Sequence, residues 1–275
     1  MAVIIFLLIV LAVLVYRHYT WKPLPWPTGA LQPPPYQGHR GYWKAGAREN
    51  TMLSFEAAKT RGLTMIEMDI RLSKDQVPVV FHDTDLKRIA NLEKIVHEST
   101  AQELREWAQA PSLEEVLLSQ KIPQYLNIEL KSAAIFDGTL EKEVARLLKK
   151  YDMEKRVLFS SFNPLSLWRL SRYLPNVPRA LLASKEDEPE NKIYLRQMWL
   201  APYVKIHALH LDYHYVDMKQ LQKWQKRKIP VALWTVNDLD LAKKYLDAGA
   251  LSIITDSLGE VVDSSPGNKA GEPKP

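Results

Sequence analysis

The 275-residue chain contains no cysteine, which excludes disulfides, thiolate metal sites and a cysteine nucleophile. It has no glycine-rich phosphate loop and no Gly-x-Ser-x-Gly segment, so two common hydrolase signatures are missing. It also has no long basic run and no nucleic-acid recognition motif, although its net charge is +5. We therefore expect no nucleic-acid partner, and the mild positive charge suits a membrane surface or an anionic substrate.

The longest apolar segment lies at the N-terminus, where residues 2–16 form an uninterrupted apolar run. This is shorter than the roughly 20 residues of a typical membrane span, but the aromatic residues that follow can extend it into the interface. A cleavable signal peptide is the alternative, yet no basic residue precedes the run and no small-residue cleavage site follows it. We interpret residues 1–20 as a single-pass membrane anchor. Arg17 and Lys22 at its C-terminal end favour a cytoplasmic position for the rest of the chain.

The remaining chain divides by composition. Residues 21–35 contain six prolines and predict an extended, semi-rigid linker. Residues 36–262 are expected to form one folded domain, since 46% of the chain is hydrophobic and a substantial core can be buried. Residues 263–275 are rich in Gly, Pro and Lys and predict a disordered tail.

Within the folded domain, short apolar or β-branched segments alternate with segments of helical periodicity. This alternation predicts parallel strands with helical crossovers. Helices are expected at 140–151, 164–173, 218–228 and 239–248. Strands are expected at nine places: 36–40, 65–72, 77–82, 124–131, 157–162, 178–183, 208–213, 231–237 and 252–256.

The second and third expected strands are separated by only four residues, 73–76, so they must form an antiparallel hairpin. Eight strands then remain for a TIM (β/α)8 barrel, with the hairpin as an arm at its mouth. A turn centred between Asp75 and Gln76 would place Asp69 opposite His82. Glu67 and Asp69 are two residues apart and share a face, so both carboxylates can reach the mouth beside His82.

Three carboxylates interrupt apolar strands: Glu67, Asp69 and Glu129. A charge buried in a strand is costly unless it is paired or bound to a metal. Oxygen-rich sites suit Mg²⁺ or Ca²⁺, so we expect one divalent cation here. The alternative is that each carboxylate pairs with a nearby cationic side chain, namely Arg40, Arg71 or Lys131.

Other polar residues fall at expected strand ends. His39 and His82 are candidates for general acid and base, since an imidazole titrates near neutral pH. Arg40 and Lys131 can neutralise an oxyanion. Together with a cation, these groups suit hydrolysis of a phosphodiester. Trp234 either packs in the core or forms a wall for the alcohol part of the substrate.

Two further segments are ambiguous. Asp256 is either a helix cap or a carboxylate at the barrel mouth. The segment 209–214 alternates His and Asp, as a metal-binding strand would, but we interpret it as a half-buried strand whose polar residues point outward.

An ordered set of short motifs resembles the glycerophosphodiester phosphodiesterase family and covers nearly all of residues 36–258. The motifs are Gly38-His39-Arg40-Gly41, Glu49-Asn50-Thr51, Ser54-Phe55, Glu67-Met68-Asp69, Phe81-His82-Asp83, Pro111-Ser112-Leu113-Glu114-Glu115, Glu129-Leu130-Lys131, Ser161-Phe162, Trp234-Thr235-Val236-Asn237 and Ile253-Ile254-Thr255-Asp256.

The resemblance implies a TIM barrel that hydrolyses glycerophosphodiesters to glycerol 3-phosphate and an alcohol, with Mg²⁺ or Ca²⁺. It implies metal ligation by Glu67, Asp69 and Glu129, and acid–base roles for His39 and His82. It further implies contact with substrate by three residues: Arg40, Lys131 and Trp234. Membrane-anchored relatives include lysophospholipase D enzymes, so the resemblance also makes a lysophospholipid a candidate substrate.

Two other functions stay open at the level of sequence. A catalytically silent, membrane-tethered barrel could act as a lipid-binding module, although it would not need to keep buried carboxylates. A phosphatidylinositol-type phospholipase C would not need three acidic ligands. The oligomeric state does not follow from the sequence.

Overall fold

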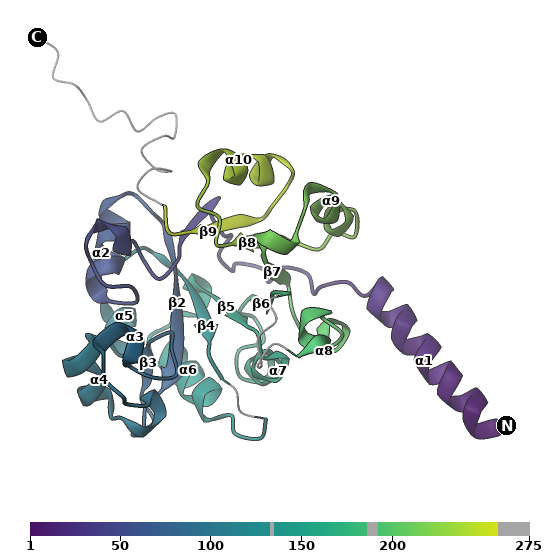
Figure 1. The fold of residues 1–275 in the computed structure, drawn as a ribbon, viewed down its shortest axis with the longest axis horizontal. Coiled ribbons are helices and arrows are strands. Elements are labelled where there is room, and N and C mark those ends of the chain that lie inside the picture. The colour runs from purple at the N-terminus through teal and green to yellow at the C-terminus, as the bar shows by residue number, and fades with distance from the viewer. Residues whose placement is uncertain (133–134, 186–191, 258–275) are drawn as a thin grey trace, which may run out of the picture.

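The computed structural model describes residues 1–132, 135–185 and 192–257. Within these ranges nine strands form one sheet (Figure 1). Eight of them are parallel and close into a barrel, which confirms the predicted TIM fold. In order around the ring they are β1 (Tyr36–Gly38), β2 (Met65–Leu72), β4 (Tyr125–Leu130), β5 (Val157–Ser161), β6 (Arg179–Ala183), β7 (Ala208–Asp212), β8 (Val231–Trp234) and β9 (Ser252–Thr255).

The helices of the crossovers surround the barrel (Figure 1). Four of them were predicted from apolar spacing, and their observed bounds are α6 (Thr139–Lys150), α7 (Pro164–Tyr173), α9 (Met218–Lys226) and α10 (Leu239–Asp247). Others are mostly shorter and were not predicted: α2 (Met52–Thr60), α3 (Lys87–Ala90), α4 (Ala101–Ala108), α5 (Leu113–Leu118) and α8 (Ile193–Arg196).

The hairpin arm is confirmed, but its predicted register was wrong by one residue. The short β3 (Pro78–Val80) pairs antiparallel with the end of β2, and Ile70 lies opposite Val80. Asp69 therefore lies opposite Phe81, whose backbone N–H donates to the Asp69 carbonyl, and not opposite His82. The reason is the turn, in which Gln76 adopts a left-handed conformation with φ 61° and makes a three-residue loop.

Polar side chains cross the interior of the barrel below the mouth. Asn127 donates to Gln37, Gln37 donates to Ser252, and Ser160 donates to Asn127, all at 3.0–3.1 Å. The network joins strands β1, β4, β5 and β9. Because each member is buried and hydrogen-bonded, it forms a rigid floor beneath the site.

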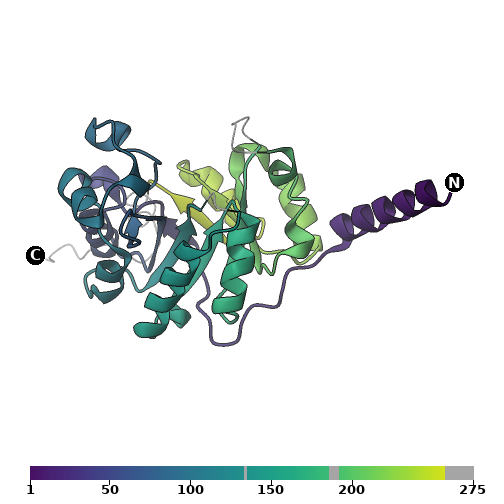
Figure 2. The same cartoon turned by 90° about the horizontal axis from the view of Figure 1, so that it is seen from below.

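The N-terminal helix α1 (Ala2–Thr20) projects away from the barrel (Figure 1). It is long and apolar enough to cross a membrane, and its apolar side chains from Val3 to Tyr16 are exposed. The segment 21–35 has no regular helix or strand and runs past the barrel to β1 (Figure 2). It packs there through Leu31, which is buried against Met65 and Leu158. The predicted end of the domain at 262 and the tail 263–275 lie outside the described residues.

Candidate active site

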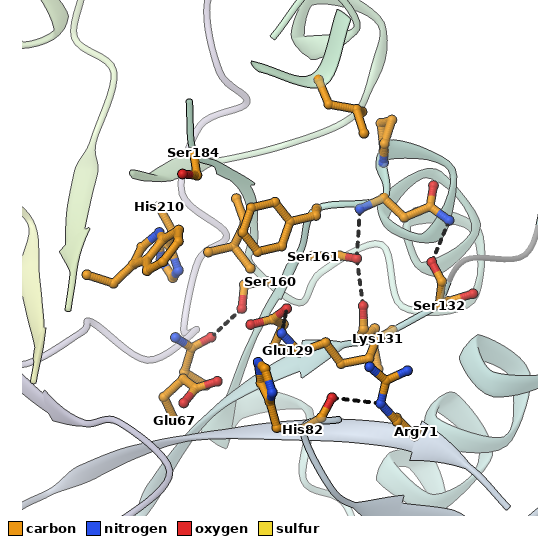
Figure 3. A pocket seen from close by; sticks show the side chains of 18 of the residues that line it. Glu67, Arg71, His82, Glu129, Lys131, Ser132, Ser160, Ser161, Ser184 and His210 are labelled. Atoms are coloured by element: carbon orange, nitrogen blue, oxygen red, sulfur yellow. Dashed lines mark hydrogen bonds and ion pairs between the residues drawn. The ribbon is translucent and has the colours of Figure 1, made fainter. Parts of the chain in front are cut away.

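A pocket of about 720 Å³ opens at the carboxyl ends of the barrel strands. This is the end of a TIM barrel that carries active sites. Seven of the eight site residues expected from the sequence line it: His39, Arg40, Glu67, His82, Glu129, Lys131 and Trp234. The eighth, Asp69, lies beneath them with an exposed fraction of 1%. Figure 3 shows Glu67, His82, Glu129 and Lys131 around this space.

The three expected carboxylates converge. Oxygen atoms of Glu67, Asp69 and Glu129 lie within 4.8 Å of one another, and all three residues are buried. The pairing of β2 with β4 explains this, because Asp69 and Glu129 are direct neighbours across the two strands. Asn50, just before α2, donates to Asp69 at 2.8 Å and fixes the orientation of that carboxylate.

Two cationic side chains accompany the carboxylates. Lys131 Nζ lies 2.5 Å from Glu129 and 3.2 Å from Asp69. Arg40 Nε lies 3.3 Å from Asp69, and the Arg40 backbone N–H donates to Glu67 at 3.1 Å. Some of the ion pairs that we considered as the alternative to a metal are therefore present. Three carboxylates against two cations still leave one surplus negative charge when all are ionised.

Burial and mutual repulsion shift the pKa values of the three carboxyl groups in different directions. Burial raises the pKa of Glu67 well above its usual range, and repulsion from Asp69 and Glu129 adds to the effect. Burial likewise raises the pKa of Glu129. Burial also opposes ionisation of Asp69, but Lys131 and other neighbours outweigh it and hold its pKa well below the usual value. An added cation would relieve the repulsion that raises Glu67, so this donor set fits a divalent ion.

Each candidate catalytic histidine is held by a carboxylate. His39 Nδ1 lies 2.7 Å from Asp256, which also accepts from Trp43 and from Asn237. The ambiguity over Asp256 is thus resolved in favour of a carboxylate at the mouth. With Nδ1 occupied, His39 has Nε2 available for the pocket.

His82 has the same arrangement, with Nδ1 2.7 Å from Asp83. Arg88 orients Asp83 through a contact of 2.7 Å and also pairs with Glu49. Burial, together with the nearby cations, lowers the pKa of His82 to about 4 despite the attraction of Asp69. His82 is therefore neutral at physiological pH and able to accept a proton.

The far wall of the pocket is made by strands β6 to β8. Trp234 stands there with its ring 5.8 Å from that of Phe162, so it is a wall residue and not part of the packed core. Our interpretation of segment 209–214 as a strand is confirmed for residues 209–212, but the expected half-burial was wrong. All of β7 is buried, and His210 lines the pocket instead of pointing outward. Strands with both faces covered lose the alternation on which that interpretation relied.

Residues 39–260 match the glycerophosphoryl diester phosphodiesterase family. The chain belongs to this family. It is 28% identical to the glycerophosphodiester phosphodiesterase of Caldanaerobacter subterraneus over 232 residues, which cover 79% of this chain and 92% of the relative. It is 32% identical over 223 residues to the protein YqiK of Bacillus subtilis, covering 76% and 89%.

The fold of the phosphodiesterase agrees with solved relatives. An Oleispira antarctica phosphodiesterase, solved with its product sn-glycerol-3-phosphate, superposes with a TM-score of 0.71 at 26% identity, covering 83% of this chain and 95% of that one. Membership of the family makes this protein a phosphoric diester hydrolase. The family generally uses a divalent cation, and the buried carboxylate cluster is a place that can hold one.

Several residues of this phosphodiesterase site had no single role assigned from the sequence. Asp83 and Asp256 orient the histidines, while Asn50 and Glu49 orient Asp69 and Arg40. All four lie within the motifs that resemble the family, so a signal was present. Spacing alone does not reveal them, because all four lie in loops whose paths the sequence does not specify.

Proposed function

We propose that this protein hydrolyses glycerophosphodiesters to glycerol 3-phosphate and an alcohol, using Mg²⁺ or Ca²⁺ held by Glu67, Asp69 and Glu129. The observation that carries the proposal is the buried carboxylate cluster flanked by two Asp–His pairs. When bound, such a cation would polarise the phosphoryl oxygens and lower the charge barrier to attack.

The two histidines supply the proton transfers in this proposal. Neutral His82 accepts a proton at Nε2 from the attacking water, while Asp83 stabilises the imidazolium that forms. Attack at phosphorus breaks the bond to the departing alcohol, and protonated His39 donates a proton to that oxygen. Asp256 orients His39 through its contact with Nδ1. Overall, one water is consumed and two products form.

Arg40 and Lys131 are proposed to bind the phosphate. Both line the pocket and stand beside the carboxylate cluster, so a phosphate between them would place its charge next to two cations. Trp234 would then enclose the alcohol or glycerol part from the opposite wall.

We further propose that residues 1–20 anchor residues 36–262 to a membrane through the linker 21–35, with the catalytic domain on the cytoplasmic side. The apolar span Val3–Thr20 supports this. Aromatic side chains exposed near the anchor add support, because Trp and Tyr favour membrane interfaces. They include Tyr203, and Arg17 of α1 stacks 4.9 Å from the Tyr203 ring centroid.

A membrane position would give access to lysophospholipids, cleaved as by a lysophospholipase D. The apolar residues at the rim of the pocket are compatible with a lipid: Ile135, Leu165, Leu195 and Leu200. A soluble glycerophosphodiester fits the same chemistry, so the substrate must be decided by assay.

The test is release of head group by the detergent-solubilised full chain. Glycerophosphocholine and lysophosphatidylcholine are compared, each with Mg²⁺, Ca²⁺ or EDTA. We expect choline release that EDTA abolishes, and the better substrate separates soluble diester from lysolipid. Choline release that is insensitive to EDTA would refute the proposed dependence on a divalent cation. No release from either substrate under any condition would favour a silent, lipid-binding barrel.

A further inference from the structure

The wall opposite the carboxylates contains a histidine that the proposed chemistry does not use. In the ring of eight strands, β7 lies four positions from β2 in either direction, so it faces β2 across the barrel. His210 is at the centre of β7, has an exposed fraction of 0% and lines the pocket. Figure 3 shows it together with Ser184, apart from His82 and Arg71.

Neither ring nitrogen of His210 has a hydrogen-bond partner among the residues that the structure describes. Its neighbours across the adjacent strands explain this, since Leu182 and Ala232 offer only apolar side chains. The indole N–H of Trp234, on β8, is likewise without a partner in the described parts of the chain. Buried polar groups are normally satisfied, so two such groups on one pocket wall call for an explanation.

The donors and acceptors of the His210 ring and the Trp234 indole determine which ligand groups can form hydrogen bonds with them. A neutral imidazole presents one donor and one acceptor, and the indole N–H presents one donor. Burial lowers the pKa of His210 to about 3, which keeps the ring uncharged. A hydroxyl both donates and accepts, so it matches the imidazole on either side. A quaternary ammonium such as choline has no proton to donate, and the exposed rim of the pocket suits it better than this enclosed wall.

The distribution of charge orients the substrate across the pocket. The cationic groups Arg40 and Lys131 lie on the β1–β2–β4 side, where a phosphate is expected. A moiety attached to that phosphate and directed inward meets the wall of His210 and Trp234. Glycerol has hydroxyls on the carbons next to its phosphate ester, whereas the other alcohol can extend outward past the apolar rim.

We propose that His210 and Trp234 form a hydroxyl-binding subsite that recognises the glycerol part of the substrate. This rests on the proposed function, because it takes the phosphate position from it. His210 is here a specificity residue, and it takes no part in proton transfer to the reacting oxygens. The subsite makes hydroxyls on the bound alcohol a condition for tight binding.

Binding measured by calorimetry on the full-length, detergent-solubilised protein tests the subsite without requiring turnover. The two probes are sn-glycerol 3-phosphate and n-propyl phosphate, which differ only in the two hydroxyls. We expect the wild type to bind the glycerol compound at least roughly 10-fold more tightly. In His210→Leu the ratio of the two Kd values should fall to roughly 1–3, with the affinity for propyl phosphate unchanged within about twofold.

Two more variants exclude a general loss of structure. His210→Asn retains a donor and an acceptor and should recover part of the preference. Trp234→Phe retains the aromatic wall without the N–H and should lower the ratio by roughly threefold or more. Equal binding of both probes to the wild type, binding of neither, or an equal loss for both in His210→Leu would each overturn the subsite. A preserved preference in a protein that hydrolyses no glycerophosphodiester would support the subsite and refute the proposed function.

Discussion

The two sides of the barrel mouth treat their polar groups differently. On the β1–β2–β4 side, charges crowd together and nearly every one has an ionic or hydrogen-bonding partner, as for Asp69 with Lys131, Arg40 and Asn50. On the β6–β8 side, the ring nitrogens of His210 and the indole N–H of Trp234 have no hydrogen-bond partner among the residues that the structure describes. This contrast agrees with both proposals, in which one side holds charge in place for chemistry and the other recognises a neutral group.

A third Asp–His pair makes this comparison testable. His214, just after β7, lies 2.8 Å from Asp212 through Nδ1, as His39 and His82 lie beside their own carboxylates. It is largely exposed and does not line the pocket. The same pairing therefore occurs on both sides of the barrel, but on the β7 side it lies outside the site.

The largest effect is expected from His82→Ala. Loss of the proposed general base should lower kcat by roughly 10²–10⁴. The matched control is His214→Ala, which removes the histidine of an Asp–His pair on the other side and should leave kcat within about threefold of the wild type. Steady-state kinetics with glycerophosphocholine as the substrate give kcat and KM for both variants. A rise in KM with unchanged kcat in His82→Ala would instead assign His82 to binding.

The second prediction concerns stability in acid. Burial lowers the pKa of His210 to about 3 in the folded protein, against about 6.5 in the unfolded chain. Between pH 3 and 6.5 the ring is therefore protonated in the unfolded state and neutral in the folded state. Stability from this group is complete above pH 6.5 and declines as the pH falls toward 3. The loss at pH 4 is on the order of 3 kcal/mol. His210→Leu should flatten this decline, measured by urea unfolding between pH 4 and 7.5; an unchanged slope would contradict the burial of an uncharged ring.

Asp83→Asn should have a smaller effect on catalysis. Its carboxylate orients His82 and stabilises the imidazolium, so we expect kcat to fall by roughly 10–100-fold with KM little changed. Asp212→Asn is the matched change in the pair outside the site. Equal effects of the two substitutions on kcat would mean that Asp83 has only a structural role.

The smallest effect is expected from Arg88→Gln. Arg88 reaches Asp83 and Glu49, but its side chain is about half exposed, so solvent screens these contacts. We expect a loss of stability of less than about 1 kcal/mol and a fall in kcat of less than about fivefold. A loss of kcat as large as that of His82→Ala would contradict this expectation and would mean that catalysis depends strongly on the contact between Arg88 and Asp83.

Much of the fold follows from local sequence. Apolar runs predicted all nine strands, and the short connection 73–76 predicted the hairpin. The register of that hairpin did not follow, because Gln76 takes a left-handed conformation that sequence rules assign to Gly or Asn. Helices α2, α4 and α5 are short and were not predicted, although capping boxes at Thr51, Thr100 and Ser112 mark their starts.

The site was predictable on its charged side and, apart from Trp234, not on its other side. Carboxylates within apolar strands stand out, and the geometry brings Glu67, Asp69 and Glu129 together as expected. His210 does not stand out in the same way, because a neutral ring in a strand is compatible with either face. Only closure of the barrel, which covers both faces of β7, directs it into the pocket.

The central claim, a divalent cation at the carboxylate cluster, is tested most directly by thermal unfolding of metal-free protein titrated with Mg²⁺ or Ca²⁺. Wild type and Asp212→Asn should both gain several degrees in Tm, because the ion binds only the folded state. Glu67→Gln should lose this response while remaining folded, since the substitution removes a carboxylate that burial and repulsion already disfavour. No cation-dependent shift in the wild type, or an undiminished shift in Glu67→Gln, would contradict the account.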